Sequence, residues 1–279
     1  LGRTDGVAKD PHWAANICGV PADSIATLAR SMATKRTFLN AAWSLQRAQH
    51  GEQPYWMAAT LAAMLERVHA ALASSRDRLC ELDGAIGDAD HGITMEAGFR
   101  AVRDAQRELP DDAAPYARLA AAARAFLNAT GASAGPLYAT ALLRASAAIK
   151  DHHTLDAAAT ACLIGAMRDG IVARGKAEPG DKTMLDAWQP AATAATAAAS
   201  DGDASPASVL EAATLAAADG ARATAALQAR LGRAARLGER SIGHVDPGAV
   251  SAALLLAAMA GGTADVDALL DDCRDGAGS

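Results

Sequence analysis

The sequence predicts an all-α protein, and both its composition and the spacing of its apolar residues support this class. Of the 279 residues 51% are hydrophobic, most of them alanine, whereas aromatic residues make up only 4%. Alanine is the best helix former, while β-branched and aromatic residues favour strands. Apolar residues recur at helical spacing, as at Met95, Phe99 and Val102. We therefore expect closely packed helices.

Charge and cysteine content exclude several classes of function. The formal net charge is −6 and no basic stripe is present, which argues against nucleic acid as a partner. The four cysteines lie far apart without a CxxC pair, as expected for a reduced cytoplasmic protein. No apolar run reaches the roughly 18 residues of a membrane span, so no membrane partner is expected.

The first 65 or so residues differ in character from the rest. They contain three of the four tryptophans, and the stretch from Pro21 to Arg30 predicts a capped helix. The short apolar run from Thr37 to Leu39 follows and predicts a strand. This part is therefore expected to be a small unit of a helix followed by a strand.

From Tyr55 onward the apolar spacing is helical. The first expected helix is a single long one that runs to Leu82. The helices expected after it cover residues 93–109, 116–128, 137–149 and 154–174.

Capping residues predict where the later helices begin. Asp181 is the expected N-cap of an alanine-rich helix, in which Gln189-Pro190 marks a bend or a restart. Ser205-Pro206 begins the next helix, since proline suits the first helical turn. Asp246-Pro247 begins a final helix that ends at Met259.

The stretch from Leu82 to Gly92 carries the strongest functional signal. It holds three carboxylates in eight residues, with glycines between them: Asp83, Gly84, Gly87, Asp88, Asp90 and Gly92. Glycine permits the positive φ angles of a tight reversal, and the short aspartate side chain can be held rigidly. Mg²⁺ takes oxygen ligands from carboxylates, water and substrate phosphates. This acidic loop is a candidate magnesium site with enough acids for a second ion.

The acidic loop leads into the N-terminus of the helix predicted from Ile93. Free backbone N–H groups and the positive end of the helix dipole attract anions such as phosphate at such a position. Two other interpretations of the loop remain open, an acidic capping turn and a structural Ca²⁺ loop. The spacing of an EF-hand is absent, because no glutamate occupies the twelfth position.

Two glycine-containing turns are further candidates. In the turn from Thr130 to Tyr138 the small residues let a ligand approach the backbone amides, although a helix-packing hinge has the same composition. The turn from Gly175 to Asp186 carries Lys176 and Lys182, which are expected to be solvated surface lysines.

A basic loop precedes the last helix. Arg233, Arg236 and Arg240 can grip phosphates, since guanidinium makes paired hydrogen bonds to oxyanions. His244 follows them, either as an acid–base group or as a hydrogen-bonding strut, and the strut is the commoner role in such turns.

Three motifs occur in a fixed order in the second part of the chain. They are Gly87-Asp88-Ala89-Asp90-His91-Gly92, the run Gly175–Met184 and the run Gly238–Gly248. Together they resemble the L subunit, or nucleotide-binding domain, of dihydroxyacetone kinases, over residues 66–279 and at full domain length. The resemblance implies an eight-helix antiparallel barrel, with ADP or ATP and two Mg²⁺ ions held by the loops at one end.

The resemblance also implies roles for individual residues. Asp83, Asp88 and Asp90 are implied as metal ligands. The residues implied in nucleotide binding are His91, Gly92, Ile93, Thr94, Ala132, Ser133, Gly175, Met184, Arg233, Asp246, Pro247 and Gly248. No catalytic residue is expected on this chain, because the family holds its substrate covalently on a histidine of a separate K subunit.

The chain departs from the family pattern at three places. Residues 132–134 are Ala-Ser-Ala where the family usually has Gly-Ala-Ser, which displaces a hydroxyl by one residue. Thr94 replaces a common asparagine, and Ala235-Arg236 replace a usual Ser-Tyr pair. These differences affect contacts with phosphate and adenine and leave the metal ligands unchanged.

The activity implied is phosphoryl transfer from the bound nucleotide to dihydroxyacetone held on the K subunit. Because no K domain is attached, the resemblance favours relatives in which a phosphotransferase-system subunit rephosphorylates ADP in place. One alternative is an ATP-dependent kinase module for another small polyol. Another is a non-catalytic, ADP-bound regulatory module that contacts a transcription regulator.

The N-terminal segment resembles a different family. Residues 4–9 and the run Trp43–Gln53 are similar to an internal piece of the molybdopterin oxidoreductases of the dimethyl sulfoxide reductase type. Those enzymes are several times longer, so molybdenum chemistry is not expected. A strand without its sheet keeps unpaired edges, and residues 1–50 are expected to be partly disordered or loosely docked. We therefore predict a non-autonomous fragment at 1–65 and a kinase-type domain at 66–279.

Overall fold

The computed structural model describes most of the chain in two separate compact units, Leu1–Gln46 and Arg47–Ser279. The described residues are 10–12, 15, 21–34, 53–110, 113–131, 133–152, 154–262 and 265–271. In the first unit, helix α2 (Ala22–Thr34) confirms the helix predicted after Pro21. The strand predicted at Thr37–Leu39 lies outside the described residues.

The second unit consists of helices joined by mostly short loops, and no strand occurs in the part of the chain that the structure describes, which confirms the all-α class. Its α-helices are α3 (Gln53–Ser74), α4 (Arg76–Ile86), α5 (His91–Glu108), α6 (Pro115–Ala129), α7 (Ala134–Ala148), α8 (Ala157–Gly175), α9 (Leu185–Ala199), α10 (Pro206–Ala223), α11 (Pro247–Ala260) and α12 (Val266–Leu270). Two 3₁₀ segments, η2 (Thr224–Ala226) and η3 (Ala234–Ser241), lie between α10 and α11.

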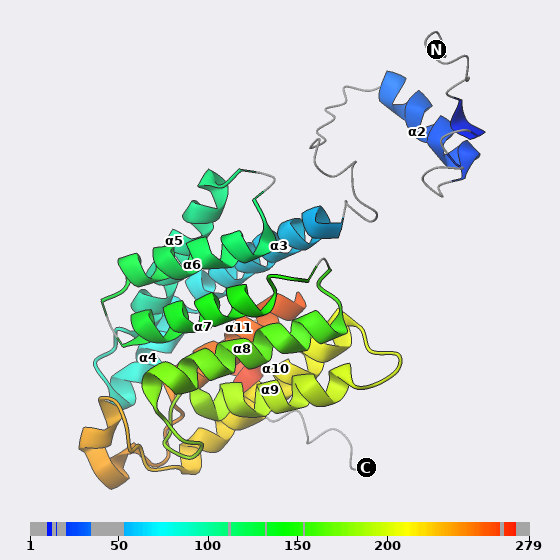
Figure 1. Ribbon diagram of the computed structural model, residues 1–279. Coiled ribbons are helices and arrows are strands. Elements are labelled where there is room, and N and C mark those ends of the chain that lie inside the picture. The colour runs from blue at the N-terminus through cyan, green and yellow to red at the C-terminus, as the bar shows by residue number, and fades with distance from the viewer. Residues whose placement is uncertain are drawn as a thin grey trace. The chain divides into compact units, whose positions relative to one another are not determined.

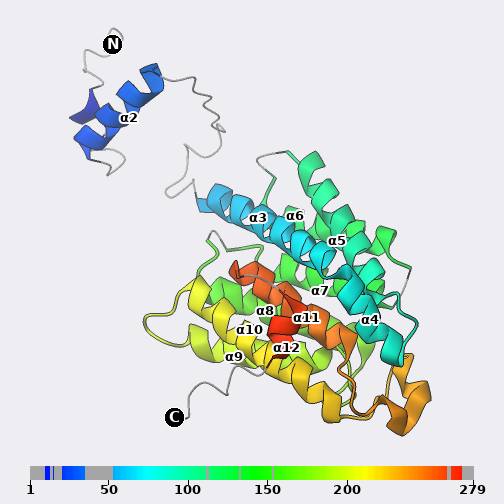
Figure 2. The same ribbon diagram turned by 180° about the vertical axis from the view of Figure 1, so that it is seen from behind.

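Helices that follow one another from α5 to α11 pack side by side, and α11 returns to contact α3 (Figures 1 and 2). Helix α11 also contacts α4, α5 and α9, and it is buried from Pro247 to Met259. A helix that is apolar on all sides belongs in the interior of a bundle. Helix α11 is surrounded by other helices in this bundle. The eight-helix barrel therefore stays a prediction.

The single helix predicted from Tyr55 to Leu82 is wrong, because the chain breaks between α3 and α4. Ser75 stands at the break with φ −98° and ψ 4°. The hydroxyl of Ser74 donates to the carbonyl of Ala71 at 2.9 Å. Serine side chains compete with the backbone for hydrogen bonds, and adjacent serines are a common place for a helix to kink. Helix α4 therefore begins as a separate helix after Ser75, and its last turn carries Asp83.

Helix α3 also runs across residue 65, where the two resemblances meet. Met57, Leu61 and Leu65 on this helix are buried in the core of the second unit. Residues 53–65 thus belong to the helical unit. The boundary at residue 65 stays a prediction, and the core of the second unit begins before it.

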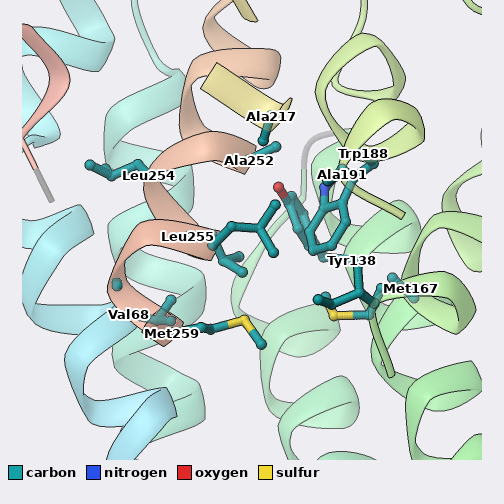
Figure 3. Packing of buried hydrophobic residues seen from close by; sticks show 14 of the residues in the cluster. Val68, Tyr138, Met167, Trp188, Ala191, Ala217, Ala252, Leu254, Leu255 and Met259 are labelled. Atoms are coloured by element: carbon teal, nitrogen blue, oxygen red, sulfur yellow. The ribbon is translucent and has the colours of Figure 1, made fainter. Parts of the chain in front are cut away.

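The core combines alanine-lined helix contacts with a small group of aromatic side chains. Phe99 and Phe126 meet edge to face with ring centroids 5.1 Å apart, and Tyr138 lies 5.5 Å from Phe126. Such geometry is favourable because the ring edge and the ring face carry opposite partial charges. Tyr138 and Trp188 lie close together beside Leu255 of α11 (Figure 3). None of the described helices combines the length and apolarity needed to cross a membrane.

We predict opposite effects for two glycine-to-alanine substitutions in α8. A Cβ at Gly170 would lie 2.5 Å from Cα of Ala141 on α7, whereas a Cβ at Gly165 would meet nothing within 4 Å. Gly170→Ala should lower the free energy of unfolding by about 1–3 kcal/mol, because backbone must move to relieve the contact. Gly165→Ala should raise it by about 0.5–1 kcal/mol through helix propensity. Urea unfolding measures both, and a pair of equal changes would contradict the described α7–α8 packing.

Candidate functional site

The helix ends at one end of the second unit enclose a cavity of about 490 Å³. Helices α5, α7, α9 and α11 begin at this cavity, and α4 and α8 end at it. The loop between α4 and α5 lies beside the segment that contains η3, drawn in orange (Figures 1 and 2). Four helix N-termini therefore direct free N–H groups and positive dipole ends toward one space, an arrangement that favours anions.

Asp83 is fixed by the backbone of the loop that follows it. Its side chain lies in the last turn of α4 and is 9% exposed. Oδ2 accepts hydrogen bonds from the backbone N–H groups of Asp90 at 3.0 Å and His91 at 3.3 Å. Because these donors belong to the N-terminus of α5, the helix dipole also stabilises the negative charge. The carboxylate is thus held in one orientation before any ligand binds.

Two glycines make this close approach of α4 and α5 possible. A Cβ at Gly87 would lie 2.2 Å from Oδ1 of Asp83, and a Cβ at Gly92 would lie 1.9 Å from the carbonyl oxygen of Arg76. Both distances are far below van der Waals contact, so a side chain at either position would push the two helices or the carboxylate aside. The tight reversal is completed by Ala89, which has a φ of 61°.

Three carboxylates converge at this reversal. Oxygen atoms of Asp83, Asp88 and Asp90 all lie within 4.8 Å of one another. The pKa of Asp90 is raised, first by partial burial and then by the nearby charge of Asp83. Arg233 supplies a positive charge by forming ion pairs with Asp88 and, at 3.4 Å, with Asp90. Closely spaced, hard oxygen donors that repel one another are the donor set that suits Mg²⁺.

His91 links the start of α5 to the start of α11. Its Nε2 lies 2.9 Å from Oγ of Ser251, and the Ser251 hydroxyl donates to the carbonyl of Gly248 at 3.0 Å. Burial lowers the pKa of His91 to about 4, while the charge of Asp83 acts in the opposite direction. The imidazole is therefore neutral at pH 7. It offers the cavity a hydrogen-bonding group without a positive charge.

Asp246 caps α11, as the sequence predicts. Its Oδ2 accepts from the backbone N–H of Ala249 at 2.8 Å, and its own N–H donates to Oγ1 of Thr224 at 2.8 Å. Burial raises the pKa of Asp246 to about 7, although the cap bond from Ala249 acts to lower it. A Cβ at Gly248 would lie 2.9 Å from Oδ2 of Asp246, so glycine leaves room for the cap.

Most residues that the resemblance implicates in ligand binding line the cavity. They are Asp83, Asp88, Asp90, His91, Thr94, Ser133, Gly175, Met184, Arg233, Asp246, Pro247 and Gly248. Gly92 is buried against α4 instead, and Ile93 is 56% exposed and does not line the cavity. Ala132 lies outside the described residues. The ligand-binding roles of the lining residues stay predictions at this point.

Two predictions for the turn before α9 are wrong. Lys182 is 1% exposed and is not a solvated surface lysine. Asp181 is not the N-cap of α9, because the helix begins at Leu185 and Asp181 instead accepts from the N–H of Glu178 at 2.8 Å. Asp186 holds this turn together by accepting from the N–H groups of Gly180 and Thr183.

The cavity also has lining residues that the sequence did not single out. They are chiefly Arg174, Thr183 and the apolar side chains of Leu137, Ile171 and Leu231. Arg174 directly precedes the Gly175 motif, a position that could have drawn attention to it. The apolar side chains look like ordinary helix or loop residues in the sequence, and only the folding of α7, α8 and the loop after α10 brings them to the cavity.

The lowered pKa of His91 predicts a specific pH dependence of stability. Its pKa is about 4 in the folded protein and about 6.5 in an unfolded chain, so the unfolded state binds the proton more tightly. Stability should therefore fall as the pH drops from about 6.5 to about 4, by up to roughly 3 kcal/mol from this group. His91→Gln should flatten that part of the profile, and His244→Gln on an exposed loop should not. Urea unfolding with a chelator present measures this, and an unchanged slope in the His91 variant would contradict it.

Comparison with known proteins shows which family the chain matches. Residues 85–261 match the family described as the DAK2 domain. The chain is 37% identical over 182 residues to the ADP-binding subunit DhaL of the PEP-dependent dihydroxyacetone kinase of Escherichia coli, covering 65% of this chain and 86% of that protein. It is also 37% identical over 203 residues to the L-erythrulose 1-kinase of Mycolicibacterium smegmatis, covering 72% of this chain and 35% of that protein.

A solved structure has the same kind of fold. The dihydroxyacetone kinase of C. freundii, in complex with AMP-PNP and Mg²⁺, matches with a TM-score of 0.57 and 25% sequence identity. The match covers 82% of this chain and 37% of that chain, so this protein corresponds to somewhat more than a third of the larger kinase.

A short stretch of the chain matches an unrelated kind of enzyme. Over 68 residues it is 54% identical to the trimethylamine-N-oxide reductase of Haemophilus influenzae, which is 24% of this chain and 8% of that protein. The resemblance of a short segment to this class of oxidoreductases is confirmed, and only a small part of such an enzyme is represented.

Proposed function

This chain belongs to the DAK2 domain family, and we propose that it is the Mg–ADP/ATP-binding subunit of a dihydroxyacetone kinase. The bound nucleotide passes a phosphoryl group to dihydroxyacetone held on a separate K subunit. The observation that carries the proposal is the convergence of Asp83, Asp88 and Asp90 at a cavity bordered by four helix N-termini.

The charges in the cavity argue for a nucleotide bound together with a divalent cation. Three carboxylates would repel the phosphates of a free nucleotide, whereas the helix N-termini and Arg233 attract them. Asp83, Asp88 and Asp90 would hold Mg²⁺, whose contribution is to neutralise charge on the transferring phosphoryl group. We expect two ions, because a single Mg²⁺ commonly takes only one or two carboxylates.

The chain's own residues bind and orient the nucleotide in this proposal. Thr94, Ser133 and Gly248 line the cavity near the starts of α5, α7 and α11, where the positive ends of the helix dipoles attract phosphate oxygens. Arg233 pairs with the acids and lies within reach of the same phosphates. The cavity is also lined by the apolar side chains of Leu137, Ile171 and Leu231, which suit contact with a base.

The phosphodonor is the second part of the proposal. The name of the Escherichia coli relative describes a PEP-dependent enzyme with an ADP-binding subunit, which supports rephosphorylation of ADP in place by a phosphotransferase-system subunit. A cytoplasmic location is expected for such a subunit. No side chain of the described site argues for the alternative of a regulatory module that contacts a transcription regulator.

A second candidate function differs only in the acceptor. The similarity to an L-erythrulose 1-kinase favours a kinase module that acts on another small polyol or ketose. The two functions use the same nucleotide site, because the acceptor would be bound outside this chain in both.

The proposal predicts that product forms only with a second subunit. The chain with Mg–ATP and dihydroxyacetone should make little phosphorylated product alone, since an unpositioned acceptor forfeits much of the roughly 7–11 kcal/mol that positioning supplies. Adding the K subunit of a dihydroxyacetone kinase should raise the rate by at least about 100-fold. Asp88→Asn should abolish that increase, and Asp201→Asn on the exposed loop after α9 should not.

The acceptor is tested in the same assay. Erythrulose in place of dihydroxyacetone, with the K subunit and with a K-type domain of an erythrulose kinase, separates the two candidate functions. Appreciable product from the chain alone would contradict the two-component proposal, because it would require an acceptor site within this protein.

A further inference from the structure

We propose that the ammonium group of Lys182 acts as a built-in cation that ties together the two ends of the loop carrying Arg233, and so positions that loop at the cavity. The inference rests on the proposed function only where it concerns nucleotide affinity. The loop is defined here as residues 224–246, which join α10 to α11.

Four backbone carbonyl oxygens surround the Lys182 ammonium. Nζ donates to Thr224 at 2.8 Å, Leu227 at 3.0 Å, Ser241 at 2.7 Å and His244 at 2.5 Å. The whole residue is only 1% exposed. A lysine has three N–H donors, so four carbonyls at these distances commit all of them. The ammonium is therefore not available to a phosphate, although Lys182 lines the cavity.

The four carbonyls come from opposite ends of the same loop. Thr224 and Leu227 stand at its start, and Ser241 and His244 stand near its end. Between these ends lies the segment that carries Arg233, which pairs with Asp88 and Asp90. A single cation bound to both ends thus closes the base of the loop and fixes where its arginine can reach.

Few other interactions close the base of the loop. The N–H of Gly243 donates to the carbonyl of Ala225 at 2.8 Å, and the N–H of Ala229 donates to Oγ of Ser241 at 2.9 Å. The N–H of Asp246 also donates to Oγ1 of Thr224 at 2.8 Å. The loop contains three glycines with positive φ, at positions 232, 238 and 243, and its helical content is limited to 3₁₀ turns. Such a segment has little local preference for one conformation, so a central cation contributes strongly to its order.

The chemistry of the cage is that of an alkali-cation site. Rings of backbone carbonyls replace the hydration shell of K⁺ in ion-selective sites, and here they replace the hydration shell of a tethered ammonium. Burial lowers the pKa of Lys182, and the nearby charge of Asp246 acts to raise it. Because the cage supplies only dipoles, losing the cation would leave four carbonyls facing one another in a buried space.

The backbone at Lys182 is adapted to this role. Its φ is 59°, in the left-handed region that side chains other than glycine seldom adopt. The turn is held by Asp186, whose carboxylate accepts from the N–H groups of Gly180 and Thr183. The turn thus keeps a strained residue in place with its side chain directed into the loop.

Chemical rescue tests the inference. Lys182→Ala removes three carbons and the ammonium, so propylammonium has the composition of the missing part. In the nucleotide-free variant, hydrogen exchange in residues 224–246 should become at least about tenfold faster and the melting temperature should fall by at least about 5 °C. Millimolar propylammonium should reverse much of both changes. Lys182→Met leaves no space for the amine and should not be rescued.

Lys176→Ala is the matched control, because Lys176 is exposed and also has a positive φ, of 55°. It should change neither loop exchange nor the response to propylammonium. Mg–ADP affinity should fall by about tenfold or more in the Lys182→Ala variant and recover with the amine. If the unaltered protein binds no nucleotide, the proposed function fails, while the exchange result still decides the role of Lys182.

Two outcomes would overturn the inference. One is loop exchange in Lys182→Ala equal to that of the unaltered protein. The other is faster exchange that the amine does not reverse, which would mean that the side chain only fills space. Should Lys182→Ala not fold, Lys182→Gln keeps N–H donors without the charge, and it must still show faster exchange in residues 224–246 for the inference to hold.

Discussion

Asp83, Asp88 and Asp90 share one small volume, and the repulsion among their carboxylates is the constraint on which the rest of the site depends. Backbone N–H groups offset part of that repulsion. Two N–H groups at the start of α5 hold the carboxylate of Asp83, and Gly92 lets α4 and α5 approach closely enough for this to happen. The break at Ser75 separates α3 from α4, the helix whose last turn carries Asp83.

Positive charge reaches the acids from a distant part of the sequence. Arg233 lies more than 140 residues after the acidic loop and pairs with two of its aspartates. The loop that carries it has little regular structure, and its ends are drawn together around Lys182. The acids and their counter-charge therefore depend on two different devices, a helix N-terminus for the first and a caged ammonium for the second. Both use backbone dipoles, which cost no side-chain entropy to orient.

The sequence predicted those features that local chemistry determines. Helix class follows from alanine content and apolar spacing, and the caps at Ser205 and Asp246 follow from side chains that bond their own first turn. The three acids were recognisable because they are close in sequence. The burial of Lys182 and the central place of α11 were not, since each depends on contacts between segments far apart in the chain. The break at Ser75 was missed although its signal, two adjacent serines, is local.

The central claim is that the three carboxylates bind nucleotide through a divalent cation. Calorimetric titration of the full chain with ADP, once with Mg²⁺ and once with excess chelator, tests it most directly. The account predicts that affinity falls by at least about 100-fold without Mg²⁺, equivalent to about 2.7 kcal/mol. Equal affinity in the two titrations would contradict it, because the nucleotide would then bind beside three uncompensated carboxylates.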